Sequence, residues 1–231
     1  TIEYFIEIPE KAKVFENVTQ ATVVFLLQKI RNERNFKLAV NLRSKCLPPE
    51  KFLSINWKEI REISCQDLGI PLIADSIEYR ILKKIHINKM SLKQIAKIAQ
   101  GDINLTVHKK YITSKKTSYF LVRGEHISRF KVDFDENKKD RRWIDFKLMK
   151  KELGERKVSI IETYMSQARI VCQNVANIGL DRRIILGLIP PDVIVGHSAE
   201  FILHLEDCGW DIKIIIAVLS STLLNWRFKK T

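Results

Sequence analysis

The chain has few cysteines, and none stands where a disulfide framework or a metal site would need it. They are Cys46, Cys65, Cys172 and Cys208. No two of them form a Cys-x-x-Cys pair, and no histidine stands beside them at the spacing of a zinc site. Isolated cysteines of this kind are typical of reduced thiols in a cytoplasmic protein. We therefore expect no disulfide and no metal centre.

Long apolar runs are missing as well. The longest, IIIAVLSSTLLNW, is shorter than the roughly 20 residues that a membrane-spanning helix needs, and it contains Ser and Asn. We interpret it as a buried helix and expect no membrane partner. No signal peptide is present and the first residue is Thr1, so we expect a piece of a longer protein or a processed product.

Motifs for cofactor, nucleotide or covalent chemistry are absent from the sequence. It has no GxGxxG, no Walker loop and no GxSxG elbow, and its five histidines are scattered. In VDFDENKKD, the residues Asp133, Asp135, Glu136 and Lys138 superficially resemble the cluster of metal-dependent nucleases, whose carboxylates and lysine converge from strand ends. Because these four lie in one polar turn, we favour a solvated loop. We predict no catalytic, cofactor-binding or metal-binding residue.

Positive charge is abundant and is concentrated in the middle of the chain. The net charge is +13. Residues 83–157 hold 21 Lys and Arg against 9 Asp and Glu, whereas residues 1–82 and 158–231 carry only +1 and zero. A basic block of this kind attracts polyanions and binds phosphates by releasing counterions. The charge alone fits a nucleic-acid partner and a merely solvated basic face equally well.

The pattern of apolar and turn residues predicts an α+β fold. The first part of the chain is expected to hold a strand, a β-hairpin and a helix, at residues 1–15, 19–42 and 76–87. Residues 56–64 fit either a short strand or a helix. Residues 90–101 fit a helix capped by Ser91 or a strand that ends at Gly101.

Beyond residue 105, strand-like segments dominate. We expect strands within residues 157–164, 168–177 and 181–206, and helices at 143–157 and 210–230. The change of character between residues 83 and 90 predicts two domains, residues 1–85 and 86–231.

The start of the chain resembles part of a known family. The stretch FIEIPEKAKVFENVTQATVVFLLQKI is similar to the segment of N6-adenine DNA methyltransferases that follows their catalytic Asn-Pro-Pro-Tyr motif. The matching residues are Pro9, Glu10, Val14, Phe15, Val18, Thr19 and Gln20. The resemblance implies that residues 1–85 are a strand and hairpin remnant of a Rossmann-like catalytic domain, with a linker.

The part beyond residue 90 resembles the TaqI-like C-terminal specificity domain, the target-recognition part of type II restriction-modification methyltransferases. One phrase, YFLVRGEHISRF, matches at Leu121, Arg123, Gly124, Ile127, Arg129 and Phe130. A later phrase matches at Arg169, Val171, Gln173, Val175 and Asn177. A final helix matches at Ala217, Leu219, Ser220, Leu223, Trp226, Phe228 and Lys229, with Ser221 one place later than the usual Asn-Ser phrase. The phrases come in the order of the family.

This resemblance implies a module that binds double-stranded DNA in a bacterial cytoplasm and positions the site for adenine-N6 methylation, and for cleavage in the IIS and IIG forms. S-adenosylmethionine is the implied cofactor of the parent protein. Neither its binding loop nor the catalytic motif occurs in residues 1–231, so none of them is assigned to methyl transfer. No small-molecule substrate of this chain is expected, and whether the chain is an enzyme stays open, as does its oligomeric state.

The charge and the resemblance together select candidate DNA contacts. They are Lys109, Lys110, Lys115, Lys116, Arg123, Arg129, Lys138, Lys139, Arg141, Arg142, Arg182 and Arg183. Gly124 lets the chain bend without a Cβ clash, so Arg123 beside it either supports this bend or reaches a phosphate or a base. The segment KKDRRW, residues 138–143, is the best candidate for a basic loop that enters a groove.

Two other classes of function stay open. One is a stand-alone nuclease or RNA-processing enzyme that uses the acidic residues of VDFDENKKD. The other is a noncatalytic protein whose basic third contacts an acidic partner. The DNA interpretation depends on the expectation that the middle of the chain forms one concave, positively charged surface.

Overall fold

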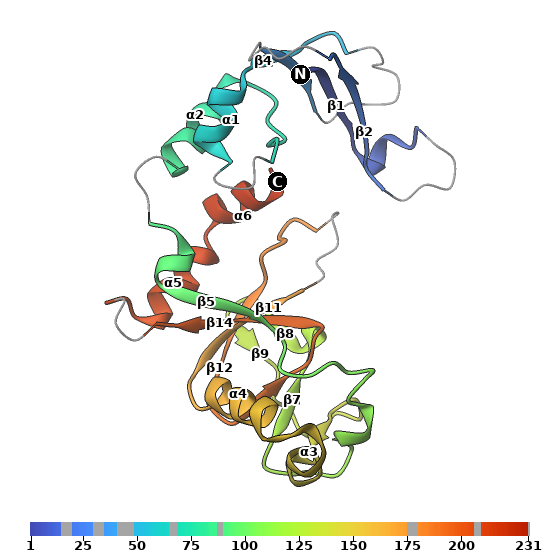
Figure 1. Ribbon diagram of the computed structural model, residues 1–231, viewed down its shortest axis with the longest axis vertical. Coiled ribbons are helices and arrows are strands. Elements are labelled where there is room, and N and C mark those ends of the chain that lie inside the picture. Colours follow the sequence, from blue (N-terminus) through green and yellow to red (C-terminus); the bar gives the residue numbers. More distant parts are fainter. Residues whose placement is uncertain are drawn as a thin grey trace. The chain divides into compact units, whose positions relative to one another are not determined.

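The computed structural model describes residues 1–14, 20–29, 35–40, 49–64, 69–86, 90–174, 180–205 and 209–230. The protein has the predicted α+β character, with helices and both mixed and antiparallel sheets (Figure 1). The chain forms two compact units: unit 1 comprises residues 1–89 and 229–231, and unit 2 comprises residues 90–228. Among the described residues, no helix has both the length and the apolar character needed to cross a membrane.

Unit 1 holds a four-stranded sheet. Its strands are β1 (Ile2–Ile8), β2 (Thr22–Leu27), β3 (Phe36–Ala39) and β4 (Leu53–Ile55). Their order is β2-β1-β3-β4, with β1 antiparallel to β2 and parallel to β3. The β-hairpin predicted for residues 19–42 is therefore wrong, because β1 lies between its two strands. Phe36, Leu38 and Ala39 are buried, and a strand this apolar takes an interior place in the sheet, which a local turn signal does not reveal.

The helices of unit 1 are favoured by residues that can be recognised in the sequence. They are the 3₁₀ turn η1 (Glu10–Ala12), α1 (Trp57–Ile63) and α2 (Ser76–His86). Asn56 accepts a hydrogen bond from the backbone N–H of Glu59 at 2.9 Å, and the Glu59 carboxylate accepts one from the backbone N–H of Asn56 at 2.9 Å. This capping box selects the helix from the two alternatives for residues 56–64. The helix predicted for residues 76–87 is confirmed as α2.

Unit 2 contains two four-stranded sheets and one small hairpin. Its strands are β5 (Ala96–Gln100), β6 (Ile112–Thr113), β7 (Phe120–Val122), β8 (Ile127–Ser128), β9 (Lys131–Val132), β10 (Trp143–Ile144), β11 (Arg169–Gln173), β12 (Leu186–Ile189), β13 (Val193–Val195) and β14 (Ala199–His204). The sheet orders are β13-β7-β10-β6 and β12-β11-β14-β5, and β8 pairs with β9. Its helices are η3 (Leu92–Gln94), η4 (Lys109–Tyr111), η5 (Gly124–His126), α3 (Phe146–Leu153), α4 (Glu155–Met165), α5 (Ile212–Leu219) and α6 (Thr222–Lys229).

Strand alternation sorts the apolar side chains of unit 2 into layers. Val122 of β7 and Val171 of β11 belong to the core between the two sheets. Leu121 faces the other way and packs with residues of α3 and α4, while Ile170 packs with residues of α5. Neighbouring residues of one strand thus serve two cores, as the two-residue period of a strand requires. The order of layers is therefore α3 and α4, then the sheet that contains β7, then the sheet that contains β11, and then α5.

A buried ion pair joins the two sheets. One terminal nitrogen of Arg169 on β11 lies 2.9 and 3.0 Å from the two carboxylate oxygens of Asp102, and both side chains are fully buried. The carboxylate also accepts a hydrogen bond from the backbone N–H of Val195 at 2.8 Å, and the guanidinium donates to the carbonyl oxygen of Val193. The pair therefore satisfies backbone groups of β13, which lies at the edge of its sheet.

Three other expectations for unit 2 can be compared with the structure. Residues 90–101 form η3, capped by Ser91, and then the strand β5, so the strand alternative is confirmed. The strand predicted for residues 157–164 is wrong, because α4 occupies this segment. Val158, Ile161 and Met165 lie at helical spacing and are buried together, and this packing outweighs the strand preference of the β-branched residues.

The helix predicted for residues 210–230 is two helices, α5 and α6, separated at Ser220 and Ser221. The Ser221 hydroxyl accepts a hydrogen bond from the backbone N–H of Leu224 at 3.2 Å, and this local bond favours a new helix start over a continuous helix. Cys172 on β11 is a free thiol whose pKa is raised to about 11 by burial, and the other three cysteines lie outside the described residues.

Candidate nucleic-acid interface

The cations of unit 2 are displayed mainly by loops and helix surfaces. Fifteen of the eighteen Lys and Arg residues between positions 90 and 157 are exposed, so the charge excess of the sequence is available to solvent. Three loop segments carry many of them: the β6–β7 connection (residues 114–119), the β8–β9 hairpin (residues 127–132) and the β9–β10 loop (residues 133–142). We call these three segments together the loop surface.

Ion pairs tie the loop surface together. Lys116 of the β6–β7 connection pairs with Glu136 of the β9–β10 loop. Asp133, the first residue of the β9–β10 loop, pairs with Lys138 and with Arg141 of the same loop. The Lys116–Glu136 pair therefore joins the β6–β7 connection to the β9–β10 loop, which directly follows the β8–β9 hairpin in the chain. Exposed ion pairs contribute little stability, so we treat these contacts as a guide to position.

Arg141 has an interior place in this structure. Its side chain is 2% exposed, its Nε donates to the carbonyl oxygen of Asp135 at 2.9 Å, and one terminal nitrogen lies 3.4 Å from the Asp140 carboxylate. Together with the Asp133 pair, these contacts hold the β9–β10 loop from within. Arg141 was predicted as a DNA contact, but its buried guanidinium is positioned to support the loop that displays its neighbours.

Arg123 also turns inward. Its terminal nitrogen lies 2.7 Å from the carboxylate of Glu125 and donates to the carbonyl oxygen of Asp140 at 2.8 Å. These contacts correspond to the first of its alternatives, support of the bend. Gly124 is needed there for a reason that the sequence did not reveal: a Cβ would lie 2.5 Å from the backbone oxygen of Ser198. Close approach of two chain segments, and not a left-handed conformation, excludes a side chain at this position.

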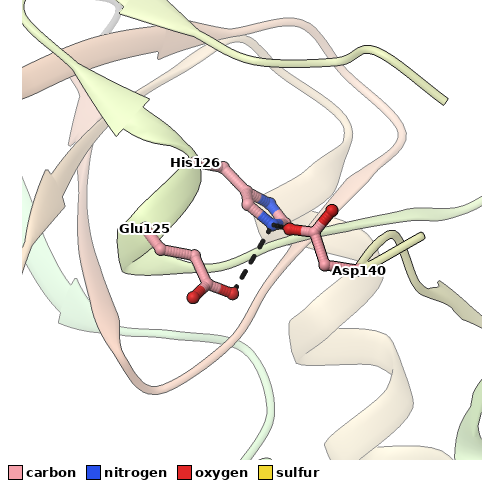
Figure 2. A group of neighbouring side chains, drawn as sticks. All are labelled: Glu125, His126 and Asp140. Carbon is pink, nitrogen blue, oxygen red and sulfur yellow. Dashed lines mark ion pairs between the residues drawn. The ribbon is translucent and has the colours of Figure 1, made fainter. Parts of the chain in front are cut away.

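Glu125, His126 and Asp140 form a group whose possible ligand atoms all lie within 4.8 Å of one another (Figure 2). The Nε2 atom of His126 is 3.8 Å from each carboxylate and lacks a hydrogen-bond partner. Its Nδ1 accepts the backbone N–H of Arg123 at 3.3 Å, so the neutral ring carries its proton on Nε2. A metal ion needs a bare Nε2, and the Arg123 guanidinium already faces Glu125. We therefore interpret the group as a neutral histidine that lies between two carboxylates, and not as a metal site.

The pKa of His126 gives a testable stability effect. Burial, followed by the Arg141 and Arg123 cations, lowers its pKa from 6.5 to about 4. The unfolded chain takes up this proton near pH 6.5 and the folded chain only near pH 4, so the free energy of unfolding falls as the pH drops through this window. We expect a loss on the order of 3 kcal/mol at the acidic end.

Urea unfolding of the wild-type chain and of His126→Asn, followed at several pH values between 7 and 4, measures this loss. Asn retains an acceptor for the Arg123 N–H but does not titrate, so the difference between the two proteins isolates His126. The same pH dependence in both proteins would contradict the assignment.

The acidic residues of VDFDENKKD do not converge on a common point. Asp133 is engaged by Lys138 and Arg141, and its pKa is far below the usual range, chiefly because of the Lys138 hydrogen bond. Asp135 accepts the backbone N–H of Asn137 at 3.1 Å, and Glu136 pairs with Lys116. Each carboxylate has a separate partner, so the geometry does not favour the metal-dependent nuclease alternative.

The other predicted contacts fall in three places. Lys115, Lys138 and Lys139 are exposed on the loop surface, and Lys115 and Lys139 have no ion pair among the described residues. The Arg142 guanidinium donates to the carbonyl oxygens of Lys139 and Arg141, at 3.0 and 2.6 Å, so part of it faces the loop backbone.

Lys109 and Lys110 lie on η4, which precedes β6 and is not part of the three loop segments. Lys110 pairs with Glu152 of α3. Arg182 and Arg183 precede β12. Arg182 donates to the carbonyl oxygen of Ser220 at 2.8 Å, and the Arg183 guanidinium lies 5.3 Å from the ring centre of Phe228. The twelve candidates thus occupy several places in unit 2, and a single concave surface remains a prediction.

Phe130, at the tip of the β8–β9 hairpin, was absent from the predicted contacts. It is 49% exposed, and its backbone has a φ of 63°. Its sequence signal is an aromatic residue between two cations, Arg129 and Lys131, in a turn where glycine or asparagine is the usual choice.

Comparison with known proteins gives only distant structural similarity. No family model and no curated protein matches the chain. Among solved structures, it is similar to one described as the type IIL restriction-modification enzyme MmeI in complex with DNA, with a TM-score of 0.39 and 11% sequence identity. The match covers 96% of this chain and 31% of that one, so this chain spans less than a third of the length of its neighbour. A TM-score this low does not establish a common fold.

Proposed function

We propose that this chain is the DNA-recognition part of a type II restriction-modification adenine-N6 methyltransferase. Residues 86–231 are the target-recognition domain in this proposal, and residues 1–85 are the end of the catalytic domain. The observation that carries the proposal is the loop surface: its three segments display exposed cations, Lys116–Glu136 joins two of the segments, and the pairs of Asp133 fix the β9–β10 loop. Such an array suits the phosphates of a duplex.

The family-like phrases support the proposal in a specific way. Arg123 and Gly124 fix the bend before the β8–β9 hairpin, and Ile127 is buried at its base. Arg169 and Val171 on β11 are fully buried. These matching residues are scaffold positions, and the cation-bearing loops lie between them. Of the other matching residues, Phe15, Val18, Thr19, Val175 and Asn177 lie outside the described part of the chain.

In the parent protein, the catalytic domain and this chain would have different roles. An enzyme that methylates adenine in a duplex must extrude that base into its catalytic pocket. S-adenosylmethionine would supply the methyl group there, but no residue of this chain is assigned to hold it. This chain would hold the flanking duplex through exposed lysines such as Lys115 and Lys139, and a few loop side chains would choose the sequence. In restriction-modification proteins of types IIS and IIG, the same contacts with the duplex would also position a cleavage site.

Selection from a pool of random-sequence duplexes tests this function. The 231-residue chain is incubated with the pool in the absence of S-adenosylmethionine and divalent metal, and the retained duplexes are sequenced. We expect enrichment of one short motif. A retained pool without any enriched motif would contradict sequence recognition.

The nuclease alternative has its own test. The chain and the triple variant Asp133→Asn, Asp135→Asn, Glu136→Gln are incubated with duplex DNA and Mg²⁺. We expect no cleavage that depends on these three carboxylates, because each is engaged by a separate partner. Cleavage by the wild-type chain that the triple variant loses would establish the nuclease instead.

A further inference from the structure

The tip of the β8–β9 hairpin presents an aromatic ring to solvent. The two-residue turn consists of Arg129 and Phe130, and both are exposed. The Arg129 guanidinium lies 4.8 Å from the centre of the Phe130 ring, so a cation covers part of one ring face. The ring is therefore outside the apolar cores of unit 2, at the end of a projecting turn.

The backbone at Phe130 is in an unfavourable conformation for its side chain. Its φ of 63° is in the left-handed region, where glycine and asparagine are tolerated and a bulky aromatic residue is an outlier. A cost on the order of 1 kcal/mol or more is typical for such a residue. Burial does not offset this cost, because half of the side chain is exposed. A strained residue with little to gain from packing points to a role outside folding.

The hairpin beneath the ring is anchored. The backbone N–H of Phe130 donates to the carbonyl oxygen of Leu186 on β12 at 2.6 Å. Gly187 allows this close contact, since a Cβ there would lie 2.6 Å from Val132 and 3.1 Å from the backbone oxygen of Lys131. The backbone of the tip, which carries the ring, is thus held on the sheet by a hydrogen bond and by close packing.

The surroundings of the ring identify the chemistry of its partner. Arg129 and Lys131 flank it and are exposed, and the hairpin continues into Asp133, which is paired with Lys138 and Arg141 of the β9–β10 loop. An apolar protein partner would have to desolvate these cations. A nucleic acid offers both a phosphate chain for the cations and stacked bases for the ring.

We propose that Phe130 stacks into the base column of the bound duplex, as a wedge at the site where the base stack is opened. This inference rests on the proposed function and adds a residue to it. The ring would occupy the space between or beside bases, while Arg129 and Lys131 contact the adjacent phosphates. An opened duplex would thereby gain a stacking partner that an intact duplex does not need.

The test compares two variants and two DNA probes. Phe130→Asn removes the ring and tolerates the left-handed backbone, so folding is preserved, and Phe130→Trp retains an aromatic ring. Each protein is titrated with a labelled intact duplex and with the same duplex containing one abasic site, and fluorescence anisotropy gives the affinities. We expect the wild-type chain and Phe130→Trp to prefer the abasic duplex by roughly tenfold, in line with the usual strength of base–aromatic stacking.

Only the preference for the abasic duplex should be lost in Phe130→Asn. Phe130→Asn should bind both duplexes equally, with the salt dependence of the wild-type chain, because its phosphate contacts remain. Lys139→Ala is the matched control on the same surface: it should lower the salt slope by about one and keep the abasic preference. A preference that persists in Phe130→Asn, or that the wild-type chain lacks, overturns the wedge and leaves the proposed function standing. Absence of duplex binding by the wild-type chain overturns both.

Discussion

Asp102→Ala is expected to lower the free energy of unfolding by about 3–5 kcal/mol, because it leaves the buried guanidinium of Arg169 without its counter-ion. Arg169 is fully buried, and its only carboxylate partner among the described residues is Asp102. The substitution also removes the acceptor of the Val195 backbone N–H, which is a hydrogen bond at the edge of the sheet. Urea unfolding followed by circular dichroism measures the change.

A double variant separates loss of the charge pair from loss of packing. In Asp102→Leu with Arg169→Met, no charge is left buried, and apolar replacement of a buried pair is often neutral or stabilising. We expect this double variant to recover most of the stability that Asp102→Ala loses. A loss below about 1 kcal/mol in Asp102→Ala would show that the pair does not hold the two sheets together.

The triple variant Lys115→Ala, Lys138→Ala, Lys139→Ala is expected to have the largest effect on DNA binding. All three ammonium groups are exposed on the loop surface; Lys115 and Lys139 have no ion pair among the described residues, and Lys138 would exchange its Asp133 partner for a phosphate. Each lost phosphate contact should reduce the slope of log K against log salt by about one, so the triple variant should lose up to about three. Titrations of a duplex at several salt concentrations measure the slope.

A matched control carries the same loss of charge elsewhere in unit 2. Lys93, Lys157 and Lys213 are also exposed, and they lie on η3, α4 and α5. Their triple alanine variant should change the slope much less. Equal effects of the two triple variants would mean that the net charge of the chain, and not the loop surface, sets the binding.

The sequence predicts local elements better than their partners. The helix at residues 76–87 follows from apolar spacing and is confirmed. Ser91 caps only the short turn η3, and the longer helix that was the other alternative for residues 90–101 gives way to the strand β5. The hairpin at residues 19–42 is wrong because strand pairing depends on β1, which lies elsewhere in the sequence. The strand at residues 157–164 is wrong because α4 gains a buried face in the tertiary structure. In both cases a contact distant in sequence outweighs a local preference.

The candidate site shows the same limit. The sequence locates the charge excess and the bend at Gly124, but it does not reveal that Arg123 and Arg141 point inward. The guanidinium of Arg123 meets Asp140, and that of Arg141 meets Asp133; both partners are on or beside the β9–β10 loop. Whether a cation reaches solvent depends on where a carboxylate of another segment lies, and composition carries no such information.

Duplex binding by the wild-type chain as a function of salt is the most direct test that its cations contact phosphates. A labelled duplex is titrated with the 231-residue chain at salt concentrations from roughly 50 to 300 mM, and log K is plotted against log salt. We expect a straight line that falls with a slope of several units, and weaker binding to a neutral-backbone analogue of the same duplex. A slope near zero, or equal binding to the neutral analogue, would contradict the account.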